Sequence, residues 1–173
     1  MTDQLRGQLR TWQEVHDFIF AGNATFTLVS KKTGVRFTYR VKVKKEDVEK
    51  RLAAPLVTYF LSLLRGSDNE RDYAYMGVLR KQPVRYFWTS ASGKVGRQAP
   101  AYKALLWFLD CLTYERPVLG EKLEVWHEGK CGRCGRKLTV PTSIADGLGP
   151  ECLARKMASP PPNNKELRTE VAA

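Results

Sequence analysis

Residues 35–44 have the sequence VRFTYRVKVK, in which apolar and polar side chains alternate strictly. Alternation with a period of two over this length predicts a β-strand with one buried face. The expected buried side chains are Val35, Phe37, Tyr39, Val41 and Val43, and the expected solvent-facing ones include Arg36, Arg40, Lys42 and Lys44. The stretch therefore predicts a sheet with one covered face and one cationic face.

The segment just before this strand is its natural hairpin partner. Residues 24–30, ATFTLVS, again interleave apolar and polar side chains. Between the two strands, Lys31-Lys32-Thr33-Gly34 predicts a turn in which Gly34 takes the positive φ. Lys31 and Lys32 would then lie at the tip of the hairpin and extend its cationic face.

Further elements follow from periodicity and breaker residues. A helix is expected over residues 9–20, with Thr11 and Glu14 as a capping box. Pro100 opens a strongly apolar helix that ends before Pro117 and packs across the sheet. Strands are expected at 73–80 and 84–89, a strand rather than a short helix at 56–64, and one or two helical turns at 45–54. The fold class is α+β, with an antiparallel sheet of about five strands and flanking helices.

The composition indicates a basic globular protein. Lys and Arg number 29 against 18 Asp and Glu, which gives a net charge of +11. The excess is spread over segments 1–40, 41–66, 67–100 and 127–158, so a cationic surface has to be assembled by the fold. Such a charge favours a polyanionic partner, although charges that merely increase solubility remain an alternative. Apolar runs are far shorter than the roughly 18 residues of a membrane span, and no secretory signal is visible, so we expect a cytoplasmic protein.

Four residues near the C-terminus have the spacing of a metal site. His127, Cys131, Cys134 and Cys152 form the pattern H-x3-C-x2-C-x17-C, which suits tetrahedral zinc. Four ligands would close the coordination shell, so we expect one structural zinc ion. A redox role for the C-x2-C pair is the alternative, but it lacks a thioredoxin-like context. The remaining cysteine, Cys111, lies in the apolar helix and is expected in the core.

The residues around these ligands support the same interpretation. Gly132 and Gly135 leave room for backbone N–H groups to reach the thiolates. Cys152 would lie in the first turn of a short helix over residues 151–157, where the helix dipole favours a thiolate. A small core is expected from Leu138, Val140, Ile144, Leu148 and Leu153.

The stretch HEGKCGRCGRKLT at 127–139, followed by Pro141, Ser143-Ile144, Gly147, Gly149-Pro150 and Cys152, resembles an uncharacterised zinc-binding domain family. That family, a domain of unknown function, is frequent in phage, plasmid and bacterial proteins, sometimes beside helicases or nucleases. The resemblance covers about residues 127–156. Residues 22–27 and 66–70 are similar to what precedes the domain in some phage and plasmid proteins. The resemblance implies zinc and a mobile-element setting, and no established activity.

Basic residues accompany both predicted features. On the zinc module they are Lys130, Arg133, Arg136, Lys137 and Arg155, and on the hairpin Lys31, Lys32, Arg36, Arg40, Lys42 and Lys44. Together they form a candidate contact surface for phosphates. Trp126 either stacks on an unpaired base or packs between the module and the rest of the chain. No recognition helix is evident, so we expect low sequence specificity, on DNA or RNA.

The sequence thus predicts four segments and a function. These are a helix at 1–23, a basic α+β domain at 24–120, a zinc module at 121–158 and a disordered tail at 159–173. We expect a non-enzymatic, zinc-containing protein of a phage or plasmid that binds single-stranded or structured nucleic acid. The alternative is a protein-interaction module, either a subunit of a nucleoprotein complex or an anti-CRISPR-like inhibitor of a bacterial defence complex. A metal-dependent nuclease built on Asp68, Glu70 and Asp72 is a weaker third hypothesis, because no supporting Lys or His pattern accompanies them.

Overall fold

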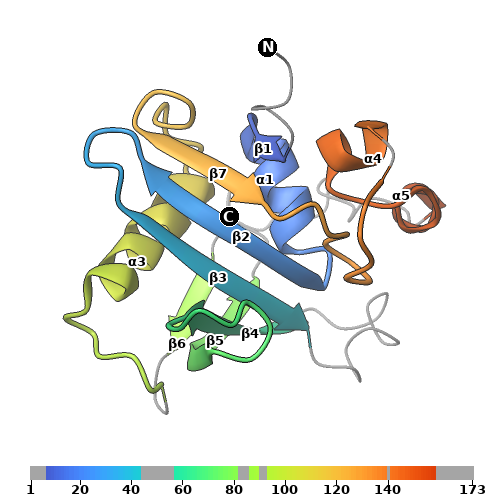
Figure 1. The fold of residues 1–173 in the computed structure, drawn as a ribbon. Coiled ribbons are helices and arrows are strands. Elements are labelled where there is room, and N and C mark those ends of the chain that lie inside the picture. Colours follow the sequence, from blue (N-terminus) through green and yellow to red (C-terminus); the bar gives the residue numbers. More distant parts are fainter. Residues whose placement is uncertain (1–6, 44–56, 82–85, 90–92, 140, 159–173) are drawn as a thin grey trace, which may run out of the picture.

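A computed structural model of the protein describes residues 7–43, 57–81, 86–89, 93–139 and 141–158 (Figure 1). The elements are β1 (Gln8–Leu9), α1 (Trp12–Ile19), β2 (Asn23–Ser30), β3 (Arg36–Val43), β4 (Val57–Leu64), β5 (Tyr73–Lys81), β6 (Tyr86–Thr89), α3 (Pro100–Thr113), β7 (Leu123–His127), α4 (Pro141–Asp146) and α5 (Pro150–Ala158). The α+β class is confirmed. The expected turns at 45–54, the tail at 159–173 and Lys44 lie outside the described residues.

Within the described residues, the strands form one antiparallel sheet of seven strands in the order β1-β7-β2-β3-β4-β5-β6. About five strands were predicted, and the two that were missed are β1 and β7. Strand β7 lies between β1 and β2, where Thr27 pairs with Trp126 and Phe26 with His127. The segment expected to open the zinc module therefore begins inside the main sheet.

The hairpin of β2 and β3 confirms the alternation on which the fold prediction was built. Thr27 pairs with Thr38, and their hydroxyl oxygens lie 2.8 Å apart. Gly34 has a φ of 70°, as the turn requires. The prediction was wrong at one end, because β3 begins at Arg36 and leaves Val35 in the turn with 48 % of its surface exposed.

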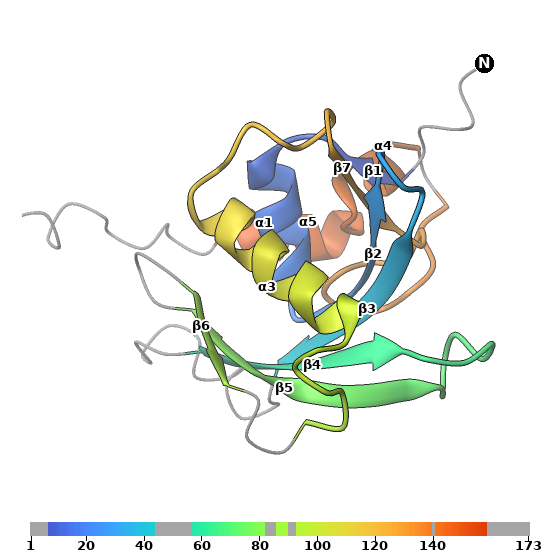
Figure 2. The same cartoon turned by 90° about the vertical axis from the view of Figure 1, so that its left-hand side faces the viewer.

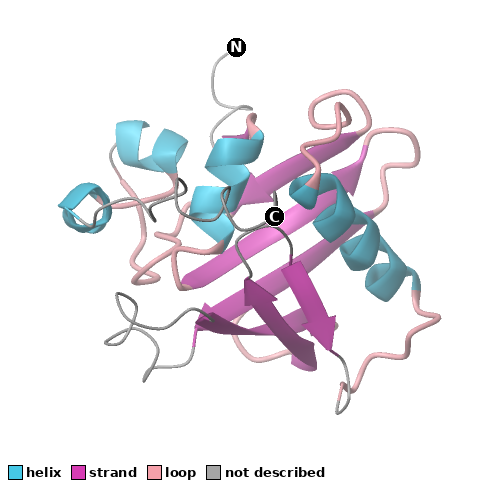
Figure 3. Cartoon of the chain, turned by 180° about the vertical axis from the view of Figure 1, so that it is seen from behind, coloured by secondary structure: helices cyan, strands magenta, loops and turns pink. Residues whose placement is uncertain are grey.

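The sheet is strongly curved, and helices α1 and α3 pack against its concave side (Figure 2). Seen from behind, the same two helices lie in front of the strands (Figure 3). Phe26 of β2 packs against Phe108 of α3, with 5.6 Å between ring centroids. The buried hydroxyl of Tyr39 donates a hydrogen bond of 2.7 Å to the carbonyl of Ala101. The opposite face of the sheet carries no described helix, and we call it the open face.

Helix α1 is fixed at its start by a capping box, in which the Thr11 hydroxyl accepts from the Glu14 N–H at 3.2 Å. Val15, Phe18 and Ile19 are buried against the sheet. The expected burial of Cys111 in α3 is also confirmed. Among the described residues, no helix has the length and apolar character needed to cross a membrane.

Candidate metal centre and open sheet face

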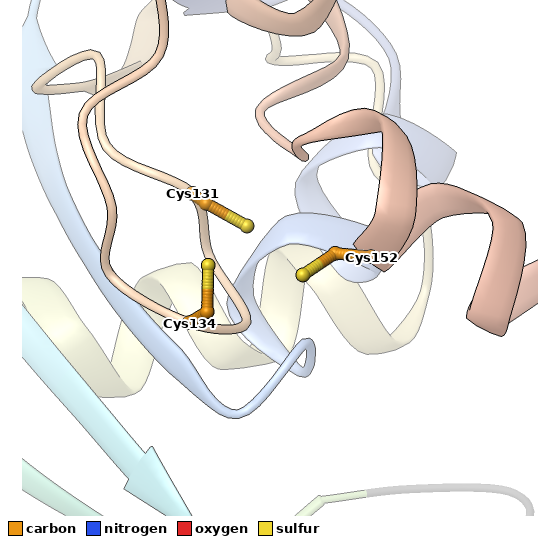
Figure 4. Close-up of side chains that lie close together, drawn as sticks. All are labelled: Cys131, Cys134 and Cys152. Carbon is orange, nitrogen blue, oxygen red and sulfur yellow. The ribbon is translucent and has the colours of Figure 1, made fainter.

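Three cysteines from two separate segments meet at one end of the molecule. Cys131 and Cys134 lie in the loop after β7, and Cys152 lies in the first turn of α5. Their sulfur atoms all lie within 4.8 Å of one another, and Figure 4 shows the three side chains pointing toward a common point. A tetrahedral zinc ion with Zn–S bonds of about 2.3 Å places neighbouring sulfurs about 3.8 Å apart. The cluster therefore fits a metal ion with small adjustments.

The loop that holds the first two cysteines is a tight backbone turn. The Gly135 N–H donates to the Cys131 carbonyl at 2.9 Å, and the Cys131 N–H donates to the Arg136 carbonyl at 2.8 Å. Gly135 has a φ of 75°, which L residues rarely adopt. The turn places both thiols of the C-x2-C motif on the same side, facing α5.

Backbone N–H groups reach the sulfur of Cys131, as expected for a thiolate site. Gly149, at the entry to α5, donates to this sulfur at 3.4 Å. Gly132 has a different role from the predicted one, because a Cβ there would lie 2.8 Å from the Phe18 carbonyl oxygen. Gly132 is therefore required for close packing of the loop on α1.

The charge state of the cluster favours a cation. Burial raises the thiol pKa of Cys131, but N–H groups of Cys134, Gly149 and Arg133 outweigh burial and bring it to about 7. Burial raises the pKa of Cys152 to about 12, reinforced by the sulfurs of Cys131 and Cys134. The helix-dipole effect expected for Cys152 does not dominate. Without metal the cluster readily holds one negative charge, and a divalent cation is needed to hold three thiolates together.

His127, the fourth expected ligand, is not brought into this cluster. The ring is buried, and its Nε2 atom lies 2.6 Å from the Ile144 carbonyl oxygen. Its Nδ1 atom accepts a hydrogen bond of 3.0 Å from the Gly129 N–H. Burial lowers the pKa of His127, which favours the neutral ring that this pair of bonds requires. The structure therefore brings together three of the four expected ligands, and His127 instead joins β7 to the segment that carries α4.

A small apolar core surrounds the cysteines. Leu138 and Leu148 are buried with Cys131 and Cys152, while Ile144 and Leu153 pack against them. Val140 lies outside the described residues. The core is continued by Phe18 of α1, whose ring would be 2.5 Å from a Cβ at Gly147. The predicted core is thus present, but it depends on α1.

A pocket of about 220 Å³ opens at the cluster. All three cysteines line it, together with Arg136, Lys137, Leu138, Thr139, Ser143, Gly149, Pro150 and Glu151. Of these, Arg136, Lys137, Thr139, Pro150 and Glu151 are exposed. An ion held by the three sulfurs would form part of the pocket wall.

The predicted basic residues of the module are placed unevenly. Lys130 lies 3.6 Å from a carboxylate oxygen of Glu128 and 3.8 Å from one of Glu70. Arg136, Lys137 and Arg155 are exposed, and Arg133 is half-buried. Lys130 is therefore partly neutralised, whereas Arg136 and Lys137 border the cysteine pocket.

On the open face, Arg40 is used inside the protein. Its guanidinium donates to the carbonyls of Asn69 and Glu70 at 2.9 and 3.0 Å, and it lies 3.6 Å from the ring centroid of Tyr73. Arg40 was expected to face solvent with the other hairpin cations, but the loop between β4 and β5 folds back to meet it.

Other hairpin cations remain at the surface. Arg36 and Lys42 are exposed, as is Lys32 at the turn. Lys31 donates to the Gly120 carbonyl at 2.8 Å and lies 3.9 Å from Glu124. The open face therefore presents Arg36 and Lys42, while Lys31 helps to fix the hairpin to the loop before β7.

Trp126 lies on the open face. It pairs with Thr27, which also lies on that face, and its indole N–H donates to Glu124 at 3.1 Å. A shallow pocket of about 360 Å³ opens here, and it is lined by Thr27, Val29, Arg36, Glu124 and Trp126. The half-buried ring of Trp126 borders this surface pocket, so it is not fully enclosed between the module and the rest of the chain.

Glu124 and the rest of this pocket were not predicted from the sequence. The signal was present in the five residues of β7, where Leu123, Val125 and His127 are buried and Glu124 and Trp126 are half-buried.

The acidic residues Asp68, Glu70 and Asp72 lie in the loop between β4 and β5, and they are not among the close groups of possible metal ligands in the described residues. Asp68 and Asp72 accept N–H bonds of their own loop, at 2.8 Å from Glu70 and 2.9 Å from Asp68 respectively.

Comparisons with known proteins identify one region of the chain. No curated protein and no solved structure matches the sequence. Residues 123–156, which contain β7, the cysteine cluster and most of α5, match the model of a family of unknown function (DUF6011).

Proposed function

We propose that the protein is a non-enzymatic nucleic-acid-binding protein with one structural zinc ion. The observation that carries the proposal is the open face of the sheet, where exposed Arg36 and the ring of Trp126 line a shallow pocket and exposed Lys42 lies further along β3. Single-stranded nucleic acid is bound by such surfaces through phosphate contacts and through stacking on aromatic side chains.

The zinc assignment rests on the donor set. Soft thiolate ligands select Zn²⁺, Cu⁺ or iron–sulfur clusters among biological metals, and zinc suits a small tetrahedral site. One cluster of three cysteines is found among the described residues, which supports a stoichiometry of one ion per chain.

The role proposed for the ion is structural. The loop after β7 and the helices α4 and α5 have few buried apolar residues of their own. A structural zinc ion contributes about 10–16 kcal/mol of apparent binding free energy, enough to order such a segment.

Nucleic acid would follow the open face across neighbouring strands. Arg36 on β3 borders the Trp126 pocket, Lys42 lies at the other end of β3, and Arg80 lies on β5. These side chains contact phosphates without reading bases, so the binding would be largely indifferent to sequence. Arg40 is left out of this surface because it holds the β4–β5 loop.

The setting proposed is a phage, plasmid or similar mobile element, within the cytoplasm. This rests on the resemblance of residues 127–156 to domains frequent in such proteins, and on the reduced cysteines that a thiolate site requires.

The nucleic-acid proposal is tested by fluorescence anisotropy with labelled single-stranded DNA, RNA and duplex. The double variant Arg36→Gln, Lys42→Gln should weaken binding at least tenfold at low salt and flatten its salt dependence. The matched control is Arg97→Gln, Lys103→Gln, which removes the same charge at the start of α3 and should change affinity by less than twofold. Equal losses in the two variants would show binding governed by net charge alone and would contradict the proposed surface.

A protein partner is the second candidate, and an exposed apolar group on α3 favours it. Leu106 and Trp107 are 39 % and 44 % exposed, and both lie on a helix whose other side packs on the sheet. If metal-loaded protein fails to bind any nucleic acid at low salt, binding of a protein partner through α3 is favoured instead. That partner would belong to a nucleoprotein complex or a bacterial defence complex.

A further inference from the structure

The cysteine cluster offers three donors where zinc takes four. Among the described residues, the group of close metal-binding side chains contains Cys131, Cys134 and Cys152 and no histidine or carboxylate. Zinc with three protein ligands keeps a position for an external ligand, whereas four protein ligands close the shell. We propose that the zinc ion of this protein keeps its fourth position for a small exchangeable donor, with a thiolate preferred. The inference rests on the metal site of the proposed function.

His127, which the spacing offered as the fourth ligand, is committed to other partners. The Nε2 atom of His127 is 2.6 Å from the Ile144 carbonyl oxygen, and its Nδ1 atom is 3.0 Å from the Gly129 nitrogen. Binding the metal would break one of these bonds inside a buried environment, and an unpaired buried group costs about 1–3 kcal/mol. His127 therefore acts as a positioning residue, which joins the end of β7 to the segment before α5.

The fourth position has a route to solvent. Cys131 and Cys152 are almost fully buried, but Cys134 is exposed and all three line the 220 Å³ pocket. A volume of this size admits water or a small thiol. The donor can thus reach the ion without unfolding of the loop or of α5.

The charges at the pocket favour an anionic donor. Arg136 and Lys137 line it and are exposed, against the single carboxylate of Glu151. Three thiolates and a divalent ion carry one net negative charge, and a fourth thiolate would make two. The two cations offset that charge, and the sulfur of a thiolate matches the softness of the other three ligands.

Glu151 is the competing internal donor. It lines the same pocket and immediately precedes Cys152, yet its carboxylate is outside the group of close donors. If its side chain turned toward the ion, the shell would be closed by the chain itself. The test therefore has to separate an external donor from both Glu151 and His127.

The experiment replaces zinc by Co²⁺ in the full chain, with a phosphine reductant so that no free thiol is present. Visible absorption of Co²⁺ reports its ligands. Titration with 2-mercaptoethanol should shift the bands and saturate at one thiol per ion, while ethylene glycol should leave them unchanged. Glu151→Gln should have the wild-type spectrum and the same response to thiol.

Two results with Co²⁺ would overturn the inference. One is a spectrum that does not respond to thiol, and the other is a Glu151→Gln spectrum that differs from wild type before thiol is added. A third measurement covers His127 without a variant that risks misfolding. In ¹¹³Cd-loaded, ¹⁵N-labelled wild-type protein, neither imidazole nitrogen of His127 should show scalar coupling to cadmium, and such a coupling would contradict an open position.

Failure of this inference is distinguishable from failure of the proposed function. Protein that binds Co²⁺ tightly but gives a closed, thiol-insensitive spectrum retains the metal site and loses only the open position. Protein that binds no Co²⁺ overturns both the metal site and the inference.

Discussion

The Nζ atom of Lys156 lies 2.6 Å from Oδ2 of Asp17, and this ion pair joins α5 to α1. Sequence places the two residues far apart, but the pair fixes the helix that carries Cys152 to the helix that packs on the sheet. His16 also contacts Asp17, at 3.7 Å between Nδ1 and Oδ1. The cysteine cluster is therefore held to the main fold by charge as well as by the Phe18 contacts.

This pair predicts a pH-dependent contribution to stability. Burial raises the pKa of Asp17, but hydrogen bonds from His16, Lys156 and Gln13 outweigh it and hold the pKa well below its usual value. A lowered carboxyl pKa contributes stability that is fully present above the unfolded-state pKa of about 3.9 and is lost as the pH falls toward the folded value. Because both partners are partly exposed, Asp17→Asn should cost only about 0.5–1 kcal/mol at pH 7.

The measurement is urea unfolding of wild type and Asp17→Asn at pH 7 and pH 3. Acid weakens metal binding in both proteins alike, so the difference between them isolates the carboxylate. That difference should shrink at pH 3. A difference that is equal at the two pH values would show that Asp17 contributes no ionic stabilisation.

Gly147 predicts a test of the contact between the cysteine loop and α1. A Cβ at this position would lie 2.5 Å from Cδ2 of Phe18, and its φ of 67° is unfavourable for other residues. Gly147→Ala should therefore destabilise the protein by about 2–4 kcal/mol and weaken metal binding. Gly120→Ala is the matched control, because Gly120 has a similar φ of 81° but no atom near its Cβ position. It should cost only about 1–2 kcal/mol and leave metal affinity unchanged. Unfolding with and without a chelator measures both the stability and the metal binding of each variant. Equal losses in Gly147→Ala and Gly120→Ala would contradict the role given to Phe18.

Arg40 predicts a loss of stability rather than a specific loss of binding. Arg40→Lys keeps the charge but cannot donate to two carbonyls in a fork or stack in the same way on Tyr73. We expect about 1–2 kcal/mol of destabilisation and faster hydrogen exchange in residues 66–72, with nucleic-acid affinity within threefold of wild type. A variant as stable as wild type that binds nucleic acid tenfold less tightly would place Arg40 in the binding surface instead.

Strands β3 and β7 show how far local sequence patterns predict this fold. Ten alternating residues were enough to place β3, its partner and its buried face. The five residues of β7 also alternate, but a pattern this short is weak, and its pairing with β1 and β2 depends on residues about a hundred positions away. Long-range pairing is decided by tertiary contacts, which local periodicity does not report.

The metal site shows the same division. The spacing predicted that the three cysteines lie close together, because a C-x2-C motif with a later cysteine is typical of a metal site when a thioredoxin-like context is lacking. The role of His127 was not predictable from spacing, since its partner is the backbone carbonyl of Ile144. Arg40 is a similar case, because its position on the open face was predicted but the return of the β4–β5 loop was not.

Trp126 predicts a stacking contribution to nucleic-acid binding. Trp126→Leu keeps an apolar side chain on β7 but removes the aromatic surface beside Arg36, so binding of single strands should weaken by about 1–3 kcal/mol. The control is Trp107→Leu on α3, which is 44 % exposed and away from the open face, and it should have no effect on affinity. Anisotropy titrations of both variants check the prediction. A larger loss of affinity in Trp107→Leu than in Trp126→Leu would contradict it and place the binding surface at α3.

We propose that Cys131, Cys134 and Cys152 hold a zinc ion that orders the C-terminal part of the fold. X-ray absorption by the purified protein is the decisive measurement, because the edge energy identifies the element and the fine structure reports the number of its sulfur neighbours. We expect one zinc per chain with three protein sulfurs at about 2.3 Å and a lighter fourth ligand when free thiol is absent. Protein without bound zinc, or zinc surrounded only by oxygen and nitrogen, would contradict it.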